Sequence, residues 1–405
     1  MGEPLLTIGM PIYMGGRHEG ALLRRSLKSL LGQTCQDFRV IMVNNDSPDE
    51  TEDIIKQVIG SDPRFVYLRN QRNFGFFYSM YRILTSCLTE FFVELHFDSY
   101  WAPTYAEKCL GVLKTDSQAV LAYSQCQFVD EDNNFLDLYR DAAGYAQPTP
   151  DERYLSVLAN MGWCTAYHGI MRHTTAVKHF ERTLPARNAA NDNEFLALMA
   201  LEGKLVQIEE PLFFRLKDSY QRNPETIELR QNRLYFNSPY FTKPYFLPFC
   251  RWIRDHCRDV ANFDLPLENK NSLINKTVSI ILSRYRPHIE YEINRAVDLL
   301  LEGDFKAGLA DSTEAPQGRY RYLDFVFLSE LALELEFAAL LLPDFGRINL
   351  ALAAIKINLG HQAEALPLLE RQAELTPTDL KTHSLKSRLE ASLSSQKKAK
   401  EQDQP

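Results

Sequence analysis

An aspartate directly follows a strongly apolar stretch of the chain, in a place where many α/β proteins bind ligands. The stretch from Phe91 to His96 predicts a buried strand, Asp98 stands just beyond it, and a helix then begins at Thr104, after Pro103. Ligands of open α/β sheets bind at the carboxyl ends of the strands. Asp98 is therefore the first candidate binding residue, and an acid that merely caps the strand end is the alternative.

Polar residues also follow two earlier predicted strands. Asn44, Asn45 and Asp46 come after the second strand, and Asn73 comes after the third. Because the carboxyl ends of parallel strands meet at one edge of a sheet, these side chains are expected near Asp98. A turn that caps the next helix is the alternative interpretation of the cluster after the second strand.

Alternating strands and helices would hold these residues in place. Apolar stretches predict five strands, at 5–13, 38–43, 65–68, 91–96 and 120–129. Helical periodicity predicts the intervening helices at 19–33, 50–59 and 73–87. A fourth helix is predicted to begin at Thr104, with Glu107 completing a capping box. This order predicts an α/β fold with a mainly parallel sheet and helices on both faces.

The rest of the chain is predominantly helical in character. The predicted segments are a connecting segment with some helix at 221–288, a helical domain at 289–395 and a disordered polar tail at 396–405. Ala353, Gly360, Ala365 and Pro377 stand at the offsets of a tetratricopeptide-like repeat, in which small residues let two helices approach and the proline ends the second. Gln372 stands where the repeat would have an alanine.

Composition argues against several classes of function. The formal net charge of −8 disfavours a general nucleic-acid binder, which needs a basic face. The seven scattered cysteines predict reduced core thiols in a cytoplasmic protein. The N-terminus lacks the pattern of a signal peptide, and no apolar run reaches the roughly 18 residues of a transmembrane segment. The expected location is cytoplasmic, with peripheral contact to the inner face of a membrane left open.

Four segments resemble, in the right order, motifs of the family-2 glycosyltransferases of GT-A fold. They are Thr7 to Tyr13 with a Pro-x-Tyr turn, Ser26 to Thr34 with the SLLxQT helix, Asn44 to Thr51 with the DNxSxDxT loop, and Arg69 to Gly75 with the rNxxNxG turn. The resemblance covers residues 5–220. It implies a nucleotide-sugar glycosyltransferase domain of GT-A fold over 1–220.

The resemblance also implies residues for each part of a sugar transfer. Donor-binding positions are implied at Pro11, Tyr13, Asn44, Asn45, Asp46, Asn73 and Lys217. Asp98 matches the metal-contacting aspartate of the family, and Asp192 matches the general base that takes the acceptor proton. Glu194, two residues further on, is the other acid that could match the position of the general base. The alternative interpretation is that an acid in the first turn only stabilises the helix through its dipole. Acceptor-side positions are implied at Trp101, Trp163, His168 and Gly169, where either tryptophan could stack on a sugar or belong to the core.

Several positions depart from the family pattern. Phe97 and Ser99 stand where a second aspartate is usual, Asn44 stands near the place of a base-reading aspartate, and Lys217 replaces a histidine. A charged lysine can neutralise phosphate directly but cannot ligate a metal. The implied divalent cation, Mn²⁺ or Mg²⁺, is therefore expected to be required weakly or not at all. His96 is interpreted as a core or supporting histidine, with metal binding as the alternative.

Two functions of different classes remain open. The first is an inverting glycosyltransferase of hexosyltransferase type that takes a nucleotide-diphosphate sugar, with UDP favoured, and acts on a surface glycan, a lipid-linked acceptor or a protein. Its C-terminal helices would bind a protein partner or a second copy of the chain. The second is a catalytically silent glycosyltransferase-like scaffold or binding module, which the departures favour and which Asp98 and Asp192 oppose.

Overall fold

The structure, a computed structural model, describes two compact units of the chain. The described residues are 4–14, 19–47, 50–141, 144–183, 190–217, 247–302 and 317–402. Those up to 217, together with 259–280, form the α/β unit, and 247–258 with those from 281 onward form the helical unit. The candidate site residues named above all lie in the α/β unit.

Four parallel strands form the first half of the sheet in the α/β unit. In sequence order they are β1 (Leu6–Ile12), β2 (Phe38–Asn44), β3 (Phe65–Arg69) and β4 (Phe91–Glu94), and in the sheet they lie in the order β3-β2-β1-β4. Leu6 pairs with Phe38 on one side and with Phe91 on the other, so the three strands begin at one level. Every residue of β1 is buried, as expected for a strand covered on both faces.

The second half of the sheet adds antiparallel strands. Its strands are β5 (Tyr100–Trp101), β6 (Ala119–Val129), β7 (Phe135–Tyr139), β8 (Ile170–Arg172) and β9 (Lys204–Leu216). Strand β8 runs antiparallel to both β4 and β6, whereas β9 runs parallel to β6. The predicted α/β class with a largely parallel sheet is confirmed, and the sheet as a whole is mixed.

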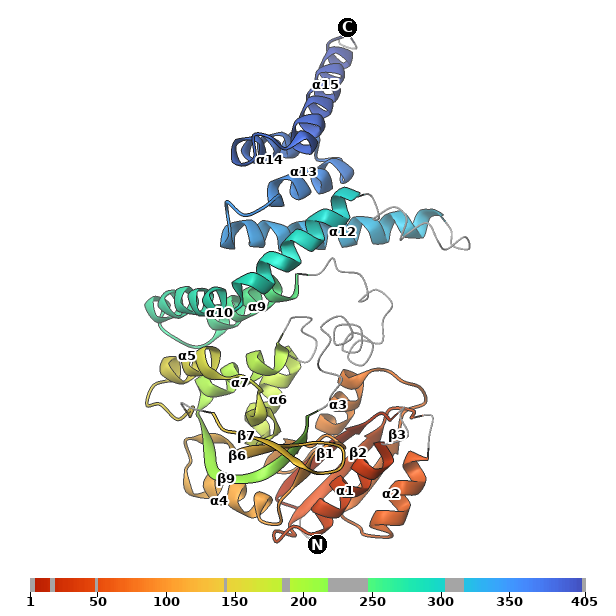
Figure 1. Ribbon diagram of the computed structural model, residues 1–405, viewed down its shortest axis with the longest axis vertical. Helices are drawn as coiled ribbons and strands as arrows, with labels where there is room; N and C mark the ends of the chain where they lie inside the picture. The colour runs from red at the N-terminus through yellow and green to blue at the C-terminus, as the bar shows by residue number, and fades with distance from the viewer. Residues whose placement is uncertain are drawn as a thin grey trace. The chain divides into compact units, whose positions relative to one another are not determined.

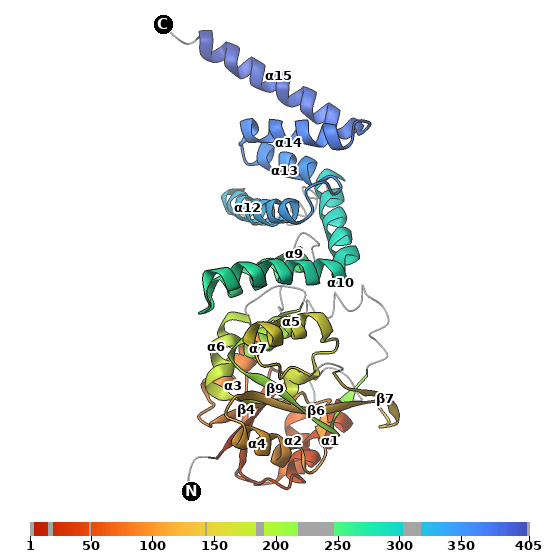
Figure 2. The same ribbon diagram turned by 90° about the vertical axis from the view of Figure 1, so that its left-hand side faces the viewer.

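Helices cover both faces of this sheet (Figures 1 and 2). On one face lie α1 (Glu19–Leu31), α2 (Thr51–Ile59) and α4 (Tyr105–Thr115). On the other lie α3 (Phe76–Thr85), α5 (Pro150–Asn160), α6 (His173–Thr183) and α7 (Asn191–Glu202). Leu23, Leu27 and Leu30 recur at helical spacing in α1 and are fully buried, which explains why this face of the helix packs on the sheet.

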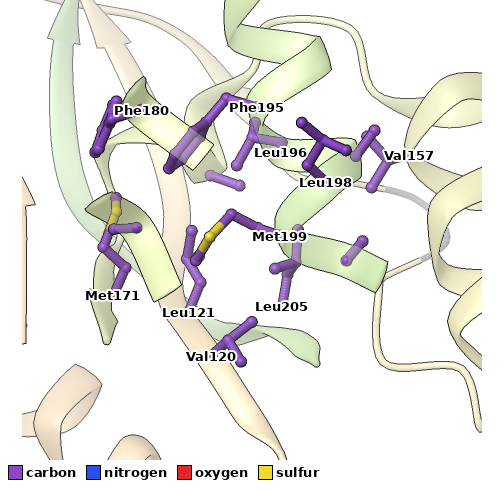
Figure 3. Close-up of a cluster of buried hydrophobic side chains, with 14 of the residues drawn as sticks. Val120, Leu121, Val157, Met171, Phe180, Phe195, Leu196, Leu198, Met199 and Leu205 are labelled. Atoms are coloured by element: carbon purple, nitrogen blue, oxygen red, sulfur yellow. The ribbon is translucent and has the colours of Figure 1, made fainter. Parts of the chain in front are cut away.

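Helix α7, which carries the candidate base Asp192, is deeply buried. Its residues from Asn193 to Leu201 are all buried, and Phe195 stacks on Phe180 of α6 with ring centroids 4.2 Å apart (Figure 3). Burying each such side chain contributes about 1.5–3 kcal/mol. This packing fixes the first turn of α7, where Asp192 stands.

Two local predictions in this unit are wrong. Strand β4 ends at Glu94, two residues earlier than expected, and a turn closed by the Ser99 N–H and the His96 carbonyl follows it. The capping box predicted for Thr104 and Glu107 does not form: Thr104 makes no side-chain cap, and the Glu107 carboxylate accepts a hydrogen bond from the Thr34 hydroxyl at 2.6 Å instead. The Glu107 carboxylate thus accepts from the distant Thr34 hydroxyl, where a capping box would have it accept from the backbone N–H of Thr104.

The helical C-terminal region is confirmed. Its helices are α9 (Pro248–Asn262) and α10 (Leu267–Glu302), both shared between the units, and α12 (Gln317–Leu341), α13 (Ile348–Asn358), α14 (Gln362–Leu375) and α15 (Leu380–Gln402). Ala353 and Ala365 are fully buried in one cluster with Leu350 and Leu369, and Gly360 adopts a left-handed φ of 84° after α13. The tetratricopeptide-like character stays a prediction. None of the described helices is both long and apolar enough to cross a bilayer.

A close approach of backbones at Gly169 gives the first testable prediction. A Cβ there would stand 2.7 Å from Leu121 Cδ2 and 2.8 Å from the Ala122 carbonyl oxygen. Gly169→Ala should therefore destabilise the α/β unit by about 1–3 kcal/mol, as overpacking does. The matched control is Gly111→Ala on α4, where a Cβ meets nothing within 4 Å, and where alanine should stabilise the helix by about 0.5–1 kcal/mol. Calorimetric melting of both variants checks this, and an unchanged or higher melting temperature for Gly169→Ala would contradict it.

Candidate active site

The loop after β2 is built on asparagine side chains, beginning with Asn44. This residue is fully buried; its Nδ2 donates to the Tyr67 hydroxyl at 3.0 Å, and its Oδ1 accepts the N–H of Ser47 at 2.9 Å. The Ser47 hydroxyl in turn accepts the N–H of Met14 at 3.0 Å. Asn44 therefore ties the β2 loop to the end of β1, and its amide is engaged within the protein.

Asn45 and Asn73 join that loop to the next one. Asn45 Oδ1 accepts hydrogen bonds from Asn70 Nδ2 at 2.8 Å and from the N–H of Phe74 at 3.1 Å. Its Nδ2 donates to Asn73 Oδ1 at 2.7 Å, and the same Asn73 oxygen accepts the N–H of Gly75 at 2.9 Å. These two candidate donor-binding residues thus hold the two loops together, and their role in donor binding stays a prediction.

Asp46 and Tyr13 are the more exposed candidates at this edge. The Asp46 carboxylate pairs with Arg69 Nη2 at 2.8 Å and remains partly exposed, on a backbone with a left-handed φ of 62°. Tyr13, just past the end of β1, is 36% exposed, whereas Pro11 is buried within β1 opposite Val43. Asp46 is therefore the acid of this loop that a ligand could reach, and Pro11 supports the strand.

A buried carboxylate and two histidines lie at the end of β4. Glu94 is fully buried, and its Oε1 lies 2.5 Å from His96 Nε2. The His96 and His168 rings meet edge to face with centroids 4.9 Å apart. Burial acts to lower the pKa of His96, but the charge and hydrogen bond of Glu94, assisted by Asp98, outweigh burial and raise it. Burial, then the charges of His96 and Arg215, hold the pKa of His168 well below its usual range.

Asp98 lies in the turn that follows. Its Oδ1 accepts a hydrogen bond from the Ser99 hydroxyl at 3.1 Å, and the N–H of Ser99 donates to the His96 carbonyl at 3.1 Å. Across the described ranges, no group of three or more histidine, cysteine or acidic residues could hold a metal by itself. The described residues therefore do not fit an all-protein metal cage. A cation at Asp98 would need further oxygen ligands from a bound diphosphate, the usual manner for Mg²⁺.

Asp192 stands in the first turn of α7, beside the thiol of Cys164. Burial raises the pKa of Asp192, although the N–H of Asn193 (2.8 Å), a hydrogen bond from Cys164 and the charge of Arg215 each act to lower it. Cys164 has a left-handed φ of 49° at the start of the short helix η1 (Thr165–His168), and this backbone turn brings its thiol to Asp192. The neighbouring acid Glu194 is fully buried, so Asp192 is the acid of this turn that a substrate could meet.

The two candidate tryptophans occupy different environments. Trp101 is 3% exposed and stacks on Tyr105 with centroids 4.5 Å apart, so it belongs to the core and its expected role on the acceptor side does not fit its burial. Trp163 is 39% exposed and packs against Phe128 at 5.1 Å. Trp163 is thus the tryptophan available to a ligand. Of the other two acceptor-side candidates, His168 is buried. Gly169 lies where the backbone comes too close to Ala122 of β6 for a side chain.

Two cations come from the end of β9. Arg215 donates from Nη1 to the Trp163 carbonyl at 3.1 Å, in register with Phe128 of β6. Lys217 Nζ lies 5.4 Å from the centre of the Phe128 ring, 5.8 Å from that of Trp163, and 4.0 Å from Asp137 Oδ2. A partly exposed cation over aromatic rings is available to a phosphate or to another anionic group.

Arg215 links the two halves of the site. Its charge acts on His96 and His168 beside the Asp98 turn, and also on Asp192 across the sheet edge. We name Glu94, His96, Asp98, His168, Asp192 and Arg215 the strand-end cluster.

The sequence analysis did not identify two residues near this site. Glu94 could have been found, because a lone glutamate inside an apolar strand is a signal. Cys164 could not, because its role depends on a backbone turn.

The comparisons with known proteins agree with this geometry. Residues 7–171 match the model of glycosyl transferase family 2. The chain is 26% identical over 141 residues to an uncharacterised glycosyltransferase of Methanocaldococcus jannaschii, which is 35% of this chain and 48% of that protein. It is also 26% identical over 145 residues to the chondroitin synthase of Pasteurella multocida, covering 36% of this chain and 14% of the relative. The chain therefore spans less than half of the length of these relatives.

A solved structure shares the fold at low sequence identity. S. aureus TarS 1–349 in complex with UDP-GlcNAc superposes with a TM-score of 0.53 and 14% identity, covering 96% of this chain and 92% of that one. A second crystal structure of TarS 1–349 superposes with a TM-score of 0.52 and 12% identity, covering 96% of this chain and 91% of that one. The structural likeness supports the GT-A fold, and the family match supports the resemblance to family-2 glycosyltransferases that the sequence motifs indicate. Over residues 7–171, the chain is similar to the members of glycosyl transferase family 2.

Proposed function

We propose that the protein is an inverting hexosyltransferase that moves a sugar from a nucleotide-diphosphate sugar to a hydroxyl group. The observation that supports this proposal is the match of residues 7–171 to glycosyl transferase family 2. Asp98 in the turn after β4 and Asp192 at the start of α7 support it further, since the charge of Arg215 acts both on His96 beside Asp98 and on Asp192. A surface glycan, a lipid-linked sugar or a protein side chain would supply the acceptor hydroxyl.

Asp192 is proposed as the general base. The acceptor oxygen attacks the anomeric carbon on the face opposite the nucleotide, and Asp192 takes the hydroxyl proton as the new carbon–oxygen bond forms. The bond from the anomeric carbon to the diphosphate breaks, and its electron pair leaves with the nucleotide diphosphate. A single attack of this kind inverts the anomeric configuration. The N–H of Asn193, which donates to Asp192 Oδ1 at 2.8 Å, would hold the carboxylate in place for this step.

The leaving diphosphate needs positive charge nearby. Lys217 is partly exposed, and Arg215 already acts on the strand-end cluster, so both can stabilise the developing negative charge. A divalent cation bound through Asp98 and the diphosphate oxygens would add Lewis-acid stabilisation of the leaving group. With one aspartate rather than a set of acids, the requirement for the cation is proposed to be weak.

A uridine nucleotide is the favoured donor. S. aureus TarS 1–349 forms a complex with UDP-GlcNAc, and this chain shares its fold. In this chain the exposed carboxylate of Asp46 and the hydroxyl of Tyr13 flank the edge where a base would bind. The proposed partners also include a protein or a second copy bound through the helical unit, at a cytoplasmic location.

Nucleotide binding gives the second testable prediction. In a thermal-melt panel with UDP, GDP, dTDP and CMP, each with and without Mn²⁺, UDP should raise the melting temperature most. At a hundred times its dissociation constant, a ligand stabilises a fold by about 2.7 kcal/mol. A shift without Mn²⁺ would support Lys217 and Arg215 as the main charge neutralisers. The absence of a shift with every nucleotide would contradict the proposal and support the scaffold alternative.

Substitution of the two aspartates gives the third prediction. Asp192→Asn should lower the turnover number by roughly 10²–10⁴-fold, the usual contribution of a general base, and should keep the UDP melt shift. Asp98→Asn should remove any part of that shift that depends on Mn²⁺. The matched control is Asp53→Asn, an exposed acid in the first turn of α2. Near wild-type turnover in Asp192→Asn would remove Asp192 from the proposed role.

The pH dependence of turnover gives the fourth prediction. A general base works when ionised, so activity should fall as the pH drops through the pKa of Asp192, which is raised above the roughly 3.9 of a free aspartate. The Cys164 hydrogen bond acts to lower that pKa, so Cys164→Ala should move the acid limb to higher pH. Cys164→Ser keeps a donor and should leave the limb near its wild-type position. An acid limb that is the same in both variants would contradict this assignment.

A further inference from the structure

Three tyrosine hydroxyls converge on one buried carboxylate beside the acceptor side of the site. Tyr123 donates to Asp141 Oδ2 at 2.9 Å, while Tyr139 and Tyr145 donate to Asp141 Oδ1 at 3.0 and 2.9 Å. Asp141 is 6% exposed. Hydrogen bonds to a buried charged group are each worth about 1.5–3 kcal/mol, so this group of residues is well fixed.

Tyr139 differs from the other two tyrosines because its oxygen also accepts from a loop. The N–H of Gly162 lies 3.1 Å from the Tyr139 oxygen, and the N–H of Trp163 lies 3.3 Å from it. Within the described residues, Tyr123 and Tyr145 make no hydrogen bond to that loop. Burial and then the charge of Asp141 raise the pKa of Tyr139, so its hydroxyl stays protonated and donates to the carboxylate.

The loop that Tyr139 holds carries two groups of the proposed site. The Trp163 carbonyl accepts from Arg215 at 3.1 Å, and the next residue, Cys164, is a neighbour of Asp192 that acts to lower the pKa of this acid. Tyr139 thus fixes the N–H side of the Trp163 backbone, and Arg215 fixes its C=O side. Gly162 is closely packed here, since a Cβ on it would stand 3.1 Å from the Tyr139 oxygen.

We propose that Tyr139, held by Asp141, is a positioning residue that orients the loop 162–164 for the acceptor side of the reaction. It sets the place of the Trp163 ring, which would face the acceptor, and of Cys164, the neighbour of Asp192. The effect of Tyr139 on turnover rests on the proposed function, whereas its effect on Trp163 does not.

Tryptophan fluorescence reports on this loop without any need for activity. The chain has three tryptophans, of which Trp101 and Trp252 are 3% and 2% exposed and Trp163 is 39% exposed. Quenching by acrylamide therefore comes mainly from Trp163, and Trp163→Phe gives the background. Tyr139→Phe removes the acceptor of the two loop N–H groups, so it should change the quenching constant of Trp163.

The matched control is Tyr123→Phe, which makes the same chemical change on the same carboxylate, and whose hydroxyl makes no hydrogen bond to the loop among the described residues. It should lower the melting temperature and leave Trp163 quenching unchanged. With UDP-GlcNAc as the probe, Tyr139→Phe should lower the turnover number for UDP release roughly ten- to a hundredfold, as a misplaced reacting group does, and keep KM near the wild-type value. Tyr123→Phe should change neither. Equal effects of the two variants on quenching and turnover would overturn the proposal.

A second variant approaches the same contact from the loop. Gly162→Ala places a methyl group against the Tyr139 oxygen and should change Trp163 quenching in the same way as Tyr139→Phe. Wild-type quenching in a folded Gly162→Ala variant would also overturn the proposal. If the wild-type protein releases no UDP, the proposed function fails, and the difference in quenching between Tyr139→Phe and Tyr123→Phe still decides the role of Tyr139.

Discussion

The charge of one guanidinium connects groups that come from distant parts of the chain. Arg215, near the end of β9, acts on His96 after β4, on His168 in η1 and on Asp192 at the start of α7. Its position depends on the parallel pairing of β9 with β6, which places it opposite Phe128. A buried acid such as Asp192 would be costly without such a positive charge nearby, and the same charge favours the neutral form of His168. The proposed chemistry therefore depends on the sheet that carries Arg215 to this edge.

The proposed donor side of the site is built differently from the proposed acceptor side. Asn44, Asn45 and Asn73 use their amide groups to hold neighbouring loops, so this half of the site is shaped by neutral hydrogen bonds. The acceptor side relies on charged and buried groups, with Asp192 beside Cys164. This division fits a nucleotide that binds to an ordered edge and an acceptor that meets a base of raised pKa.

Much of the α/β unit could be predicted because its signals are local. The apolar stretches of β1, β2 and β6 lie within one or two residues of their predicted ranges, since continuous burial requires continuous apolar sequence. The short strands β5, β7 and β8 could not be predicted in this way, because they are defined by pairing with distant strands. For the same reason, the side chain that pairs with Glu107 comes from Thr34, far away in the sequence.

In the candidate site, sequence could name Asp98 and Asp192 but not what surrounds them. The role of Glu94 depends on the histidines packed against it. The role of Asp141 depends on Tyr123 of β6, Tyr139 of β7 and Tyr145, which bridges to Leu205 of β9. Likewise, burial separates Trp101 from Trp163, although the family resemblance implies an acceptor-side position for both. Such roles follow from tertiary packing, which local patterns do not contain.

Hydrogen–deuterium exchange with and without UDP tests the central claim, that a nucleotide binds at the carboxyl edge of the parallel strands. We expect UDP to slow exchange in peptides that cover 44–47, 73–75 and 96–99, and to leave α13 and α14 unchanged. Unchanged exchange at these three loops under saturating UDP, or protection confined to the helical unit, would contradict the assignment of the site.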